Sequence, residues 1–336
     1  MNVRMLGAIS AIALSTGFST TASAAECGSF SIAEMNWASA ELMANVDAII
    51  LEAGFGCNVT LVPGATETTF ASMSERGQPD VAPELWINAV RVALDNAKAE
   101  GSLHSLNDAP ITGLGEGWWV TPDFAAEHPE LDTVEKVLAR PDLFPHPEDP
   151  SRGAFMGCPA GWNCQITGTN LFRALKLEEA GFDQVDPGSG AALSGAIARA
   201  YEREKPWFGY YWAPTAVLGK YKMVKVDFGS GIDNEHYEQC ISQAECENPR
   251  PTMYPPSLVN TVTTEAFASK APQAYEYLTK RAFKNAEMNE FLAWMEENQA
   301  DGDIAMEHFL RNYESSWRPW VSESAADKVK QALENL

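Results

Sequence analysis

The fold is decided between residues 29 and 62, where the chain reads SFSIAEMNWASAELMANVDAIILEAGFGCNVTLV. Ser29 to Met35 has the length and composition of a strand. Apolar residues then recur at helical spacing from Leu42 to Ile50, and Gly54 ends the helix. Cys57 to Val62 is predicted as the next strand. A helix between two such strands predicts an α/β layer with a parallel sheet.

The same alternation continues along most of the chain. Residues 80–86 are predicted as a strand and residues 88–100 as a helix, after which glycines cluster around residues 111–117. A second α/β series follows, with strands expected at 118–120, 153–157, 207–212 and 223–227 and helices at 133–138, 169–177 and 191–201. From Val259 onward the pattern is mostly helical. The sequence therefore predicts two lobes, the first made of residues 25–113 and 259–336 and the second of residues 114–258.

The N-terminus has the layout of a cleavable export signal. Arg4 precedes an apolar run from Leu6 to Phe18, and small residues follow up to Ala24. The run is too short to span a bilayer. We therefore predict a signal peptide at residues 1–24, cleavage near Ala24 and a periplasmic mature protein. Cys27 follows a glutamate, so no lipid anchor is expected.

Charge and cysteine content narrow the class of protein. The formal net charge of −22 excludes nucleic acid as a partner. Six cysteines in an exported chain predict disulfides, and their spacing favours the pairs Cys27–Cys57, Cys158–Cys164 and Cys240–Cys246. A zinc site is the alternative, but no CxxC motif occurs and the five histidines are scattered.

The sequence contains no complete catalytic motif of the kinds considered below. The segment from Gly113 to Trp118 begins like a dinucleotide fingerprint, but Trp118 stands where the last glycine is needed. The chain has no phosphate-binding loop and no nucleophile elbow. We expect no enzyme and no cofactor. The acidic loop at residues 227–235 is read as a surface turn, with a structural calcium site as the alternative.

Tryptophan is the unusual residue type in this sequence. Of the ten, several fall where strands are predicted to end, which is where α/β sheets bind ligands: Trp37, Trp86, Trp118, Trp119, Trp162, Trp207 and Trp212. Trp294, Trp317 and Trp320 are instead assigned to helix or tail packing.

Several tryptophan faces that meet in a cleft suit a quaternary ammonium group. The ring faces are negative, and a methylated cation has no ordinary hydrogen bonds to donate. Each well-desolvated face contributes about 2 kcal/mol, so three or four faces account for most of the ~8 kcal/mol of a micromolar affinity. The sequence therefore predicts a cage for a methylated amine.

Five segments together resemble the substrate-binding proteins of glycine betaine, choline and proline-betaine ABC importers. They are Asn36-Trp37-Ala-Ser39, Pro83-Glu84-Leu-Trp86, Gly115 to Pro122, Gly161-Trp162-Asn163, and Tyr211-Trp212-Ala-Pro214-Thr215 running on to Tyr221. The resemblance implies a type II periplasmic binding protein fold with two crossover strands and an ABC permease as partner. It also implies an aromatic box, onto which Trp37, Trp86, Trp119 and Trp212 map most directly.

The resemblance also bears on which amine is bound. Choline-binding members carry an acidic residue where this chain has Ser39, so choline ranks behind trimethylamine N-oxide and glycine betaine. Glu116, beside the double tryptophan, is the acidic candidate for the cage, and Glu84 is the second. No arginine lies within these motifs to hold a betaine carboxylate, although helix N-termini can do so. The expected ligand-binding residues are Trp37, Trp86, Glu116, Trp118, Trp119, Trp162 and Trp212.

Two alternatives remain open from the sequence. One is a binding protein for a sugar or an amino acid, whose pockets also stack on aromatic rings. The other is a periplasmic enzyme on the same fold, because fold does not fix function. We expect a monomer in either case.

Overall fold

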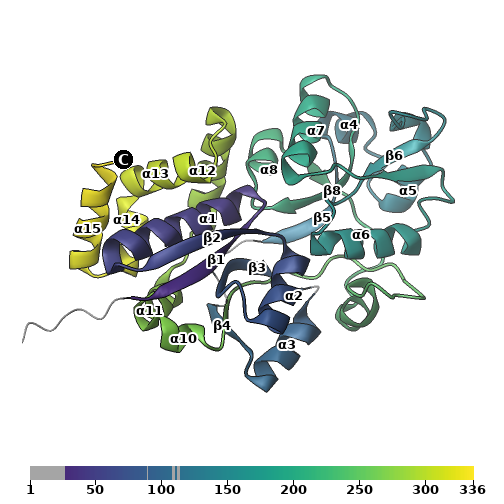
Figure 1. The fold of residues 1–336 in the computed structure, drawn as a ribbon. Coiled ribbons are helices and arrows are strands. Elements are labelled where there is room, and N and C mark those ends of the chain that lie inside the picture. The colour runs from purple at the N-terminus through teal and green to yellow at the C-terminus, as the bar shows by residue number, and fades with distance from the viewer. Residues whose placement is uncertain (1–26, 89, 108–109, 112–113) are drawn as a thin grey trace, which may run out of the picture.

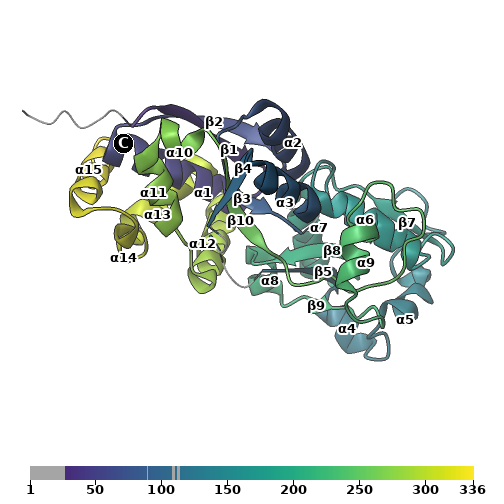
Figure 2. The same ribbon diagram turned by 90° about the horizontal axis from the view of Figure 1, so that it is seen from below.

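The computed structural model describes residues 27–88, 90–107, 110–111 and 114–336, so the predicted signal peptide lies outside the described residues. The described chain forms two α/β lobes, each built on a five-stranded sheet (Figures 1 and 2). Purple, blue and yellow segments share one lobe, which therefore takes its chain from both ends of the sequence. The predicted two-lobed α/β fold is confirmed.

The first lobe has the strand order β2-β1-β3-β10-β4. These strands are β1 (Ser29–Met35), β2 (Asn58–Gly64), β3 (Val81–Trp86), β4 (Leu103–Asn107) and β10 (Val259–Thr264). The helices of this lobe are α1 (Ala38–Ile49), η1 (Ile50–Gly54), α2 (Thr66–Arg76), α3 (Arg91–Glu100), α10 (Phe267–Lys270), α11 (Pro272–Lys280), α12 (Asn285–Asn298), α13 (Gly302–Asn312), α14 (Glu314–Trp317), η4 (Arg318–Trp320) and α15 (Glu323–Leu333).

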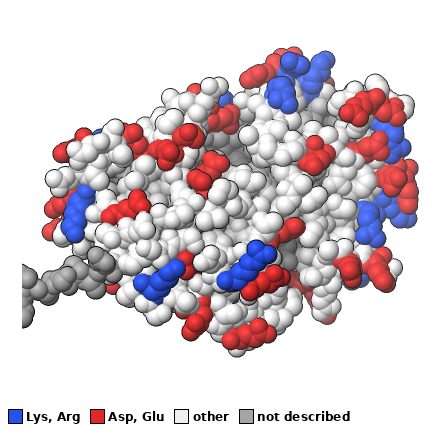
Figure 3. All heavy atoms as spheres, viewed as in Figure 1, with Lys and Arg blue, Asp and Glu red and all other residues white. Residues whose placement is uncertain are grey.

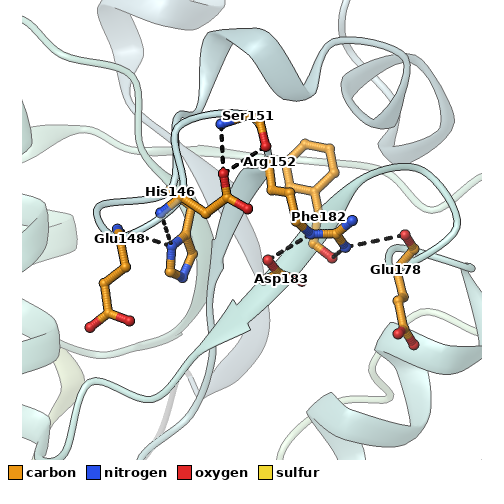
Figure 4. Close-up of polar contacts among 8 residues, drawn as sticks. His146, Glu148, Ser151, Arg152, Glu178, Phe182 and Asp183 are labelled. Carbon is orange, nitrogen blue, oxygen red and sulfur yellow. Dashed lines mark hydrogen bonds and ion pairs between the residues drawn. The ribbon is translucent and has the colours of Figure 1, made fainter.

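The second lobe has the equivalent order β7-β6-β8-β5-β9. These strands are β5 (Gly115–Val120), β6 (Gly153–Met156), β7 (Phe182–Val185), β8 (Phe208–Ala213) and β9 (Val224–Lys225). Its helices are α4 (Pro122–Glu127), α5 (Val134–Leu138), η2 (Pro141–Leu143), α6 (Asn163–Ala174), α7 (Gly190–Glu202), α8 (Ala216–Tyr221), α9 (Asn234–His236) and η3 (Tyr237–Ile241). At the start of β6, Arg152 donates to the Asp183 carboxylate over 2.6 Å and to the Phe182 carbonyl over 3.0 Å, which joins β6 to β7 (Figure 4).

Both sheets are mixed, where the opening of the sequence predicted a parallel one. β1 is parallel to β2 and β3, as expected from the helices between them, but β10 is antiparallel to β3 and to β4. In the second lobe β5 is likewise antiparallel to β8 and β9. The reason is the route of the chain, because β5 and β10 each enter their sheet directly after a crossing from the other lobe. All strands of the first sheet lie outside residues 114–258, and all strands of the second lie within them. We therefore keep residues 114 and 259 as the proposed lobe boundaries.

Each lobe has its own apolar core. Trp317 and Trp320 are buried in the first, together with α11, α13 and α15, as predicted for packing residues. Trp294 is partly buried and stacks on His308, with ring centroids 3.6 Å apart. In the second lobe Trp118 is fully buried among phenylalanines.

The three predicted disulfides are confirmed. Cys27–Cys57 joins the segment before β1 to the start of β2, Cys158–Cys164 closes the loop before α6, and Cys240–Cys246 closes the loop after η3. The second bridge flanks Trp162 on both sides in the sequence, so it restrains the loop that carries this tryptophan.

Charged groups cover the surface of both lobes. Figure 3 shows acidic side chains spread over the whole visible face and basic side chains in smaller groups, in keeping with the net charge of −22. Among the described residues, no helix is both long and apolar enough to cross a membrane.

We predict that the Cys27–Cys57 bridge contributes more stability than either of the other two. It spans 30 residues and the others 6 each. Loop-closure entropy then assigns it about 3.5 kcal/mol, against about 2 kcal/mol for each short bridge. Urea unfolding of the three double Cys→Ser variants measures this order. An equal or larger loss on removal of Cys240–Cys246 would contradict it.

Candidate functional site

A cavity lies between the two lobes, at the carboxyl ends of the parallel strands. Residues of the first lobe that line it are Trp37, Thr66, Trp86 and Asn88, and residues of the second are Glu116, Trp162, Asn163, Cys164, Thr167, Tyr210, Trp212 and Tyr237. The volume open to the centre of a water-sized sphere is about 40 Å³. That is room for roughly three water molecules or one compact organic group.

Strand ends place the four tryptophans of this cavity. Trp37 follows β1 and begins α1, and Trp86 is the last residue of β3. Trp162 follows the loop after β6 and begins α6, whereas Trp212 lies near the end of β8. Trp37, Trp162 and Trp212 are each less than 10% exposed, and Trp86 is half-buried. The four indoles thus come from four separate segments, two from each lobe.

Trp162 connects the rings of the two lobes. It meets Trp37 edge to face, with centroids 5.5 Å apart and planes at 73°, and Trp212 in the same way at 5.0 Å and 82°. Tyr210 stacks at 6.4 Å beside Trp212, two residues along the same strand. Edge-to-face geometry turns the faces of neighbouring rings in different directions, which gives the cavity several aromatic walls.

Hydrogen bonds hold the lobes together at this point. The Trp162 indole donates to the Asn36 side-chain oxygen over 2.7 Å, and the Asn163 amide donates to the Trp86 carbonyl over 3.3 Å. Both bonds cross from one lobe to the other. The structure is therefore closed over the cavity.

Glu116 is the carboxyl group that lines the cavity. It is 8% exposed, and it accepts hydrogen bonds from the Tyr210 hydroxyl over 2.9 Å and from the Ser257 hydroxyl over 3.3 Å. Burial raises the pKa of Glu116, although these two donors and the charge of Lys225 oppose the shift. The Lys225 ammonium donates to the backbone carbonyl of Glu116 and not to its carboxyl group.

Glu84 lies behind the tryptophans and does not line the cavity. It is fully buried on β3, and one carboxylate oxygen accepts from the indoles of Trp37 and Trp86 and from the Ser39 hydroxyl. Burial raises the pKa of Glu84, and the three donors and Arg281 oppose this shift only in part.

The start of α6 forms part of the cavity wall. No lysine, arginine or histidine is among its lining residues. The side chain of Trp162 does not cap α6, and Asn163, Cys164 and Thr167 of the first turns face the cavity. Free backbone N–H groups at a helix start attract negative oxygen atoms.

The structure places two of the predicted site residues elsewhere. Trp118 lies on the same side of β5 as Glu116 but further into the lobe, where it packs against Phe155 and Phe228. Trp119 lies on the opposite side of the strand, donates to the Tyr211 carbonyl over 3.2 Å and lies under the Lys225 ammonium. The alternation of side chains along a strand therefore removes Trp119 from the cavity. Trp162, which the sequence also predicted as ligand-binding, does line the cavity, whereas Trp119, one of the four tryptophans that the resemblance implied for the box, does not.

Sequence reasoning missed several other lining residues. Tyr210 is two residues before Trp212, so the period of a strand could have indicated it. Asn163 directly follows Trp162 and belonged to a quoted motif. Tyr237 and Asn88 reach the cavity from a π-helical turn and a loop, and no local pattern marks them.

The acidic loop at residues 227–235 has local partners for its carboxylates. Asp227 accepts from the Gly229 backbone, and Asp233 accepts from the His236 backbone at the start of α9. Across the part of the chain that the structure describes, no three or more His, Cys, Asp and Glu side chains gather in a way that could hold a metal ion.

Comparison with known proteins gives a family and a fold. A family model described as the substrate binding domain of ABC-type glycine betaine transport system matches residues 28–312. Among solved structures, an ABC-transporter choline binding protein in complex with choline has a TM-score of 0.72 at 16% identity, covering 91% of this chain and 98% of that one. The glycine betaine, L-proline-binding protein ProX from Borrelia burgdorferi has a TM-score of 0.70 at 15% identity, with 90% and 99% covered. Lactococcal OpuAC complexed with glycine betaine has 0.65 at 16%, with 88% and 100% covered.

We predict that Glu116→Gln becomes more stable relative to the wild type as the pH rises. Since the folded state raises the pKa of Glu116 above 4.5, it binds the proton more tightly than the unfolded chain. This stabilisation is complete below pH 4.5 and is lost as the pH rises through the folded-state value, by up to about 1.4 kcal/mol per pH unit. Glutamine has no proton to lose. Urea unfolding of both proteins between about pH 5 and pH 9 tests this, and a pH-independent difference would contradict it.

Proposed function

Since the chain belongs to the family of substrate-binding domains of ABC-type glycine betaine transport systems, we propose that it captures a small trimethylated amine between its lobes and delivers it to an ABC permease. The family that the sequence motifs indicated is therefore the family whose model matches the chain. By their names, the choline-binding and OpuAC structures hold choline and glycine betaine, which share a trimethylated nitrogen.

The observation that carries the proposal is the pairing of aromatic walls with one buried carboxyl group. Four tryptophans and Tyr210 line the cavity, and none of its lining residues is basic. A sugar needs many hydrogen-bond partners, and an amino acid needs a partner for each of its two charges. A trimethylated nitrogen needs only aromatic faces.

We further propose trimethylamine N-oxide as the preferred ligand. The cavity has room for one compact group, and this ligand adds only an oxygen atom to its trimethylated nitrogen. Glu116 offers that oxygen a hydrogen bond when its carboxyl group is protonated, which burial favours. Choline and glycine betaine carry longer substituents and require a wider cavity.

Glycine betaine is the second candidate, favoured by the start of α6. Asn163 and Cys164 at the start of α6 line the cavity, and backbone N–H groups at a helix start can hold a carboxylate. A deprotonated Glu116 would repel that carboxylate. Deprotonation of Glu116 therefore disfavours both ligands, and they differ in how many hydrogen-bond donors their oxygen atoms require.

We propose that the protein is located in the periplasm. We also propose that it binds its ligand without changing it chemically. Three disulfides suit an oxidising compartment, although the predicted signal peptide lies outside the described residues. The absence of chemical change in trimethylamine N-oxide recovered after incubation would test the second point.

We predict that each cage tryptophan contributes about 2 kcal/mol or more to binding, which is roughly thirtyfold in Kd. The variants are the alanine substitutions of Trp37, Trp86, Trp162 and Trp212, titrated calorimetrically with trimethylamine N-oxide. Trp119→Ala and Trp294→Ala are the controls, because both rings lie outside the cavity, and their Kd should stay near the wild-type value. If all four cage variants bind like the wild type, the aromatic cage is not the binding site.

We predict that trimethylamine N-oxide binds more weakly as the pH rises. Deprotonation of Glu116 removes the donor to the N-oxide oxygen and places two negative groups together, so Kd should rise about tenfold per pH unit once the pKa is passed. In Glu116→Gln the amide still donates, and the pH dependence should disappear. Titration of both proteins between about pH 6 and pH 9 measures this. Affinity that increases with pH would instead indicate cation attraction by the carboxylate.

A further inference from the structure

One oxygen atom of Glu84 holds two walls of the cavity. It accepts from the Trp37 indole over 2.7 Å, from the Trp86 indole over 2.9 Å and from the Ser39 hydroxyl over 3.0 Å. Trp37 and Ser39 come from the start of α1, whereas Trp86 comes from the end of β3. A single acceptor thus fixes the directions of two rings from separate segments.

The other oxygen of Glu84 is buried, and no residue that the structure describes forms a hydrogen bond with it. Arg281, the nearby cation, is fully buried and bonds elsewhere: its guanidinium lies 3.1 Å from Asp47 and donates to the Pro83 carbonyl and the Thr261 hydroxyl. Tyr277 also donates to Asp47. Glu84 is therefore not part of the Arg281–Asp47 ion pair. Its hydrogen-bond donors among the described residues are Trp37, Trp86 and Ser39.

This arrangement changes what the rings present to a ligand. An N–H group that donates to a carboxylate is polarised, and the strengthening is greatest in a buried, low-dielectric site. Electron density drawn toward the indole makes its face more negative, and the face is the part that attracts a methylated cation.

We propose that Glu84 is a positioning and specificity-determining residue, whose carboxylate orients Trp37 and Trp86 and strengthens their attraction for a trimethylated nitrogen without touching it. The proposal rests on the proposed function. It differs from a merely structural role, because a structural role would change the amount of folded protein and leave the affinity of that protein unaltered.

The test is Glu84→Gln, which keeps the size of the side chain and one acceptor oxygen but deletes the charge. Glu41→Gln is the matched control, because it makes the same substitution at a half-buried glutamate on α1. Among the described residues the Glu41 side chain bonds to no tryptophan, and its backbone N–H, which donates to the Trp37 carbonyl, is unchanged by the substitution. Calorimetric titration with trimethylamine N-oxide, and nitrogen-proton spectra of the indole N–H groups, are recorded for all three proteins.

We expect Glu84→Gln to bind about tenfold or more weakly and Glu41→Gln to stay within about twofold of the wild type. The indole N–H signals of Trp37 and Trp86 should shift in Glu84→Gln, while that of Trp294 stays in place. A folded Glu84→Gln with wild-type affinity would overturn the proposal, as would unmoved indole signals.

If Glu84→Gln does not fold, Trp37→Phe and Trp86→Phe replace it as the test. Each keeps an aromatic ring but has no N–H group to donate to Glu84, so each should lose several-fold in affinity. Wild-type binding by both would overturn the proposal. Failure of the proposed function is a separate result, since then the wild type itself binds no trimethylated amine, whereas the indole signals still report on Glu84.

Discussion

The contact of Trp162 with rings from both lobes is the interaction on which the site depends. Its edge meets Trp37 on one side and Trp212 on the other, and its N–H group reaches Asn36 across the lobe boundary. The Trp37–Trp162 pair is the aromatic contact that joins the first-lobe wall of the cavity to the second-lobe wall. The Cys158–Cys164 bridge restrains the loop that carries Trp162, so a covalent bond in one lobe supports the closed form of the whole protein.

Two buried carboxyl groups on either side of this contact have different tasks. Glu84 is surrounded by donors and is fully enclosed, whereas Glu116 opens onto the cavity. Burial of either group in apolar surroundings costs free energy unless hydrogen bonds or a proton offset it. Three donors offset part of this cost for Glu84 and two donors do so for Glu116, and burial raises the pKa of both groups. The same residue type therefore holds the rings from behind in one case and faces the cavity in the other.

The sequence predicted the two lobes, the disulfides and the four tryptophans that line the cavity for a common reason, since each depends on local order along the chain. Trp37, Trp86 and Trp212 stand at strand ends that hydrophobic patterns mark directly. Trp118 and Trp119 share such a position, yet alternation along β5 and depth in the lobe place both outside the cavity. Tyr237 depends on how distant segments pack, and neither strand period nor motif records that. The antiparallel entry of β10 depends on the same long-range route.

The equivalent order of the two sheets explains why the cavity forms between them. Parallel strands in each lobe end toward the cleft, so loops and helix starts from both lobes meet there. A space lined in this way presents aromatic rings, a few polar groups and one carboxyl group but no basic side chain. Such a lining distinguishes ligands by how they carry negative charge. An N-oxide concentrates its negative charge on one oxygen atom, whereas a carboxylate spreads the charge over two, so under the proposed function a single donor such as a protonated Glu116 suits the N-oxide better.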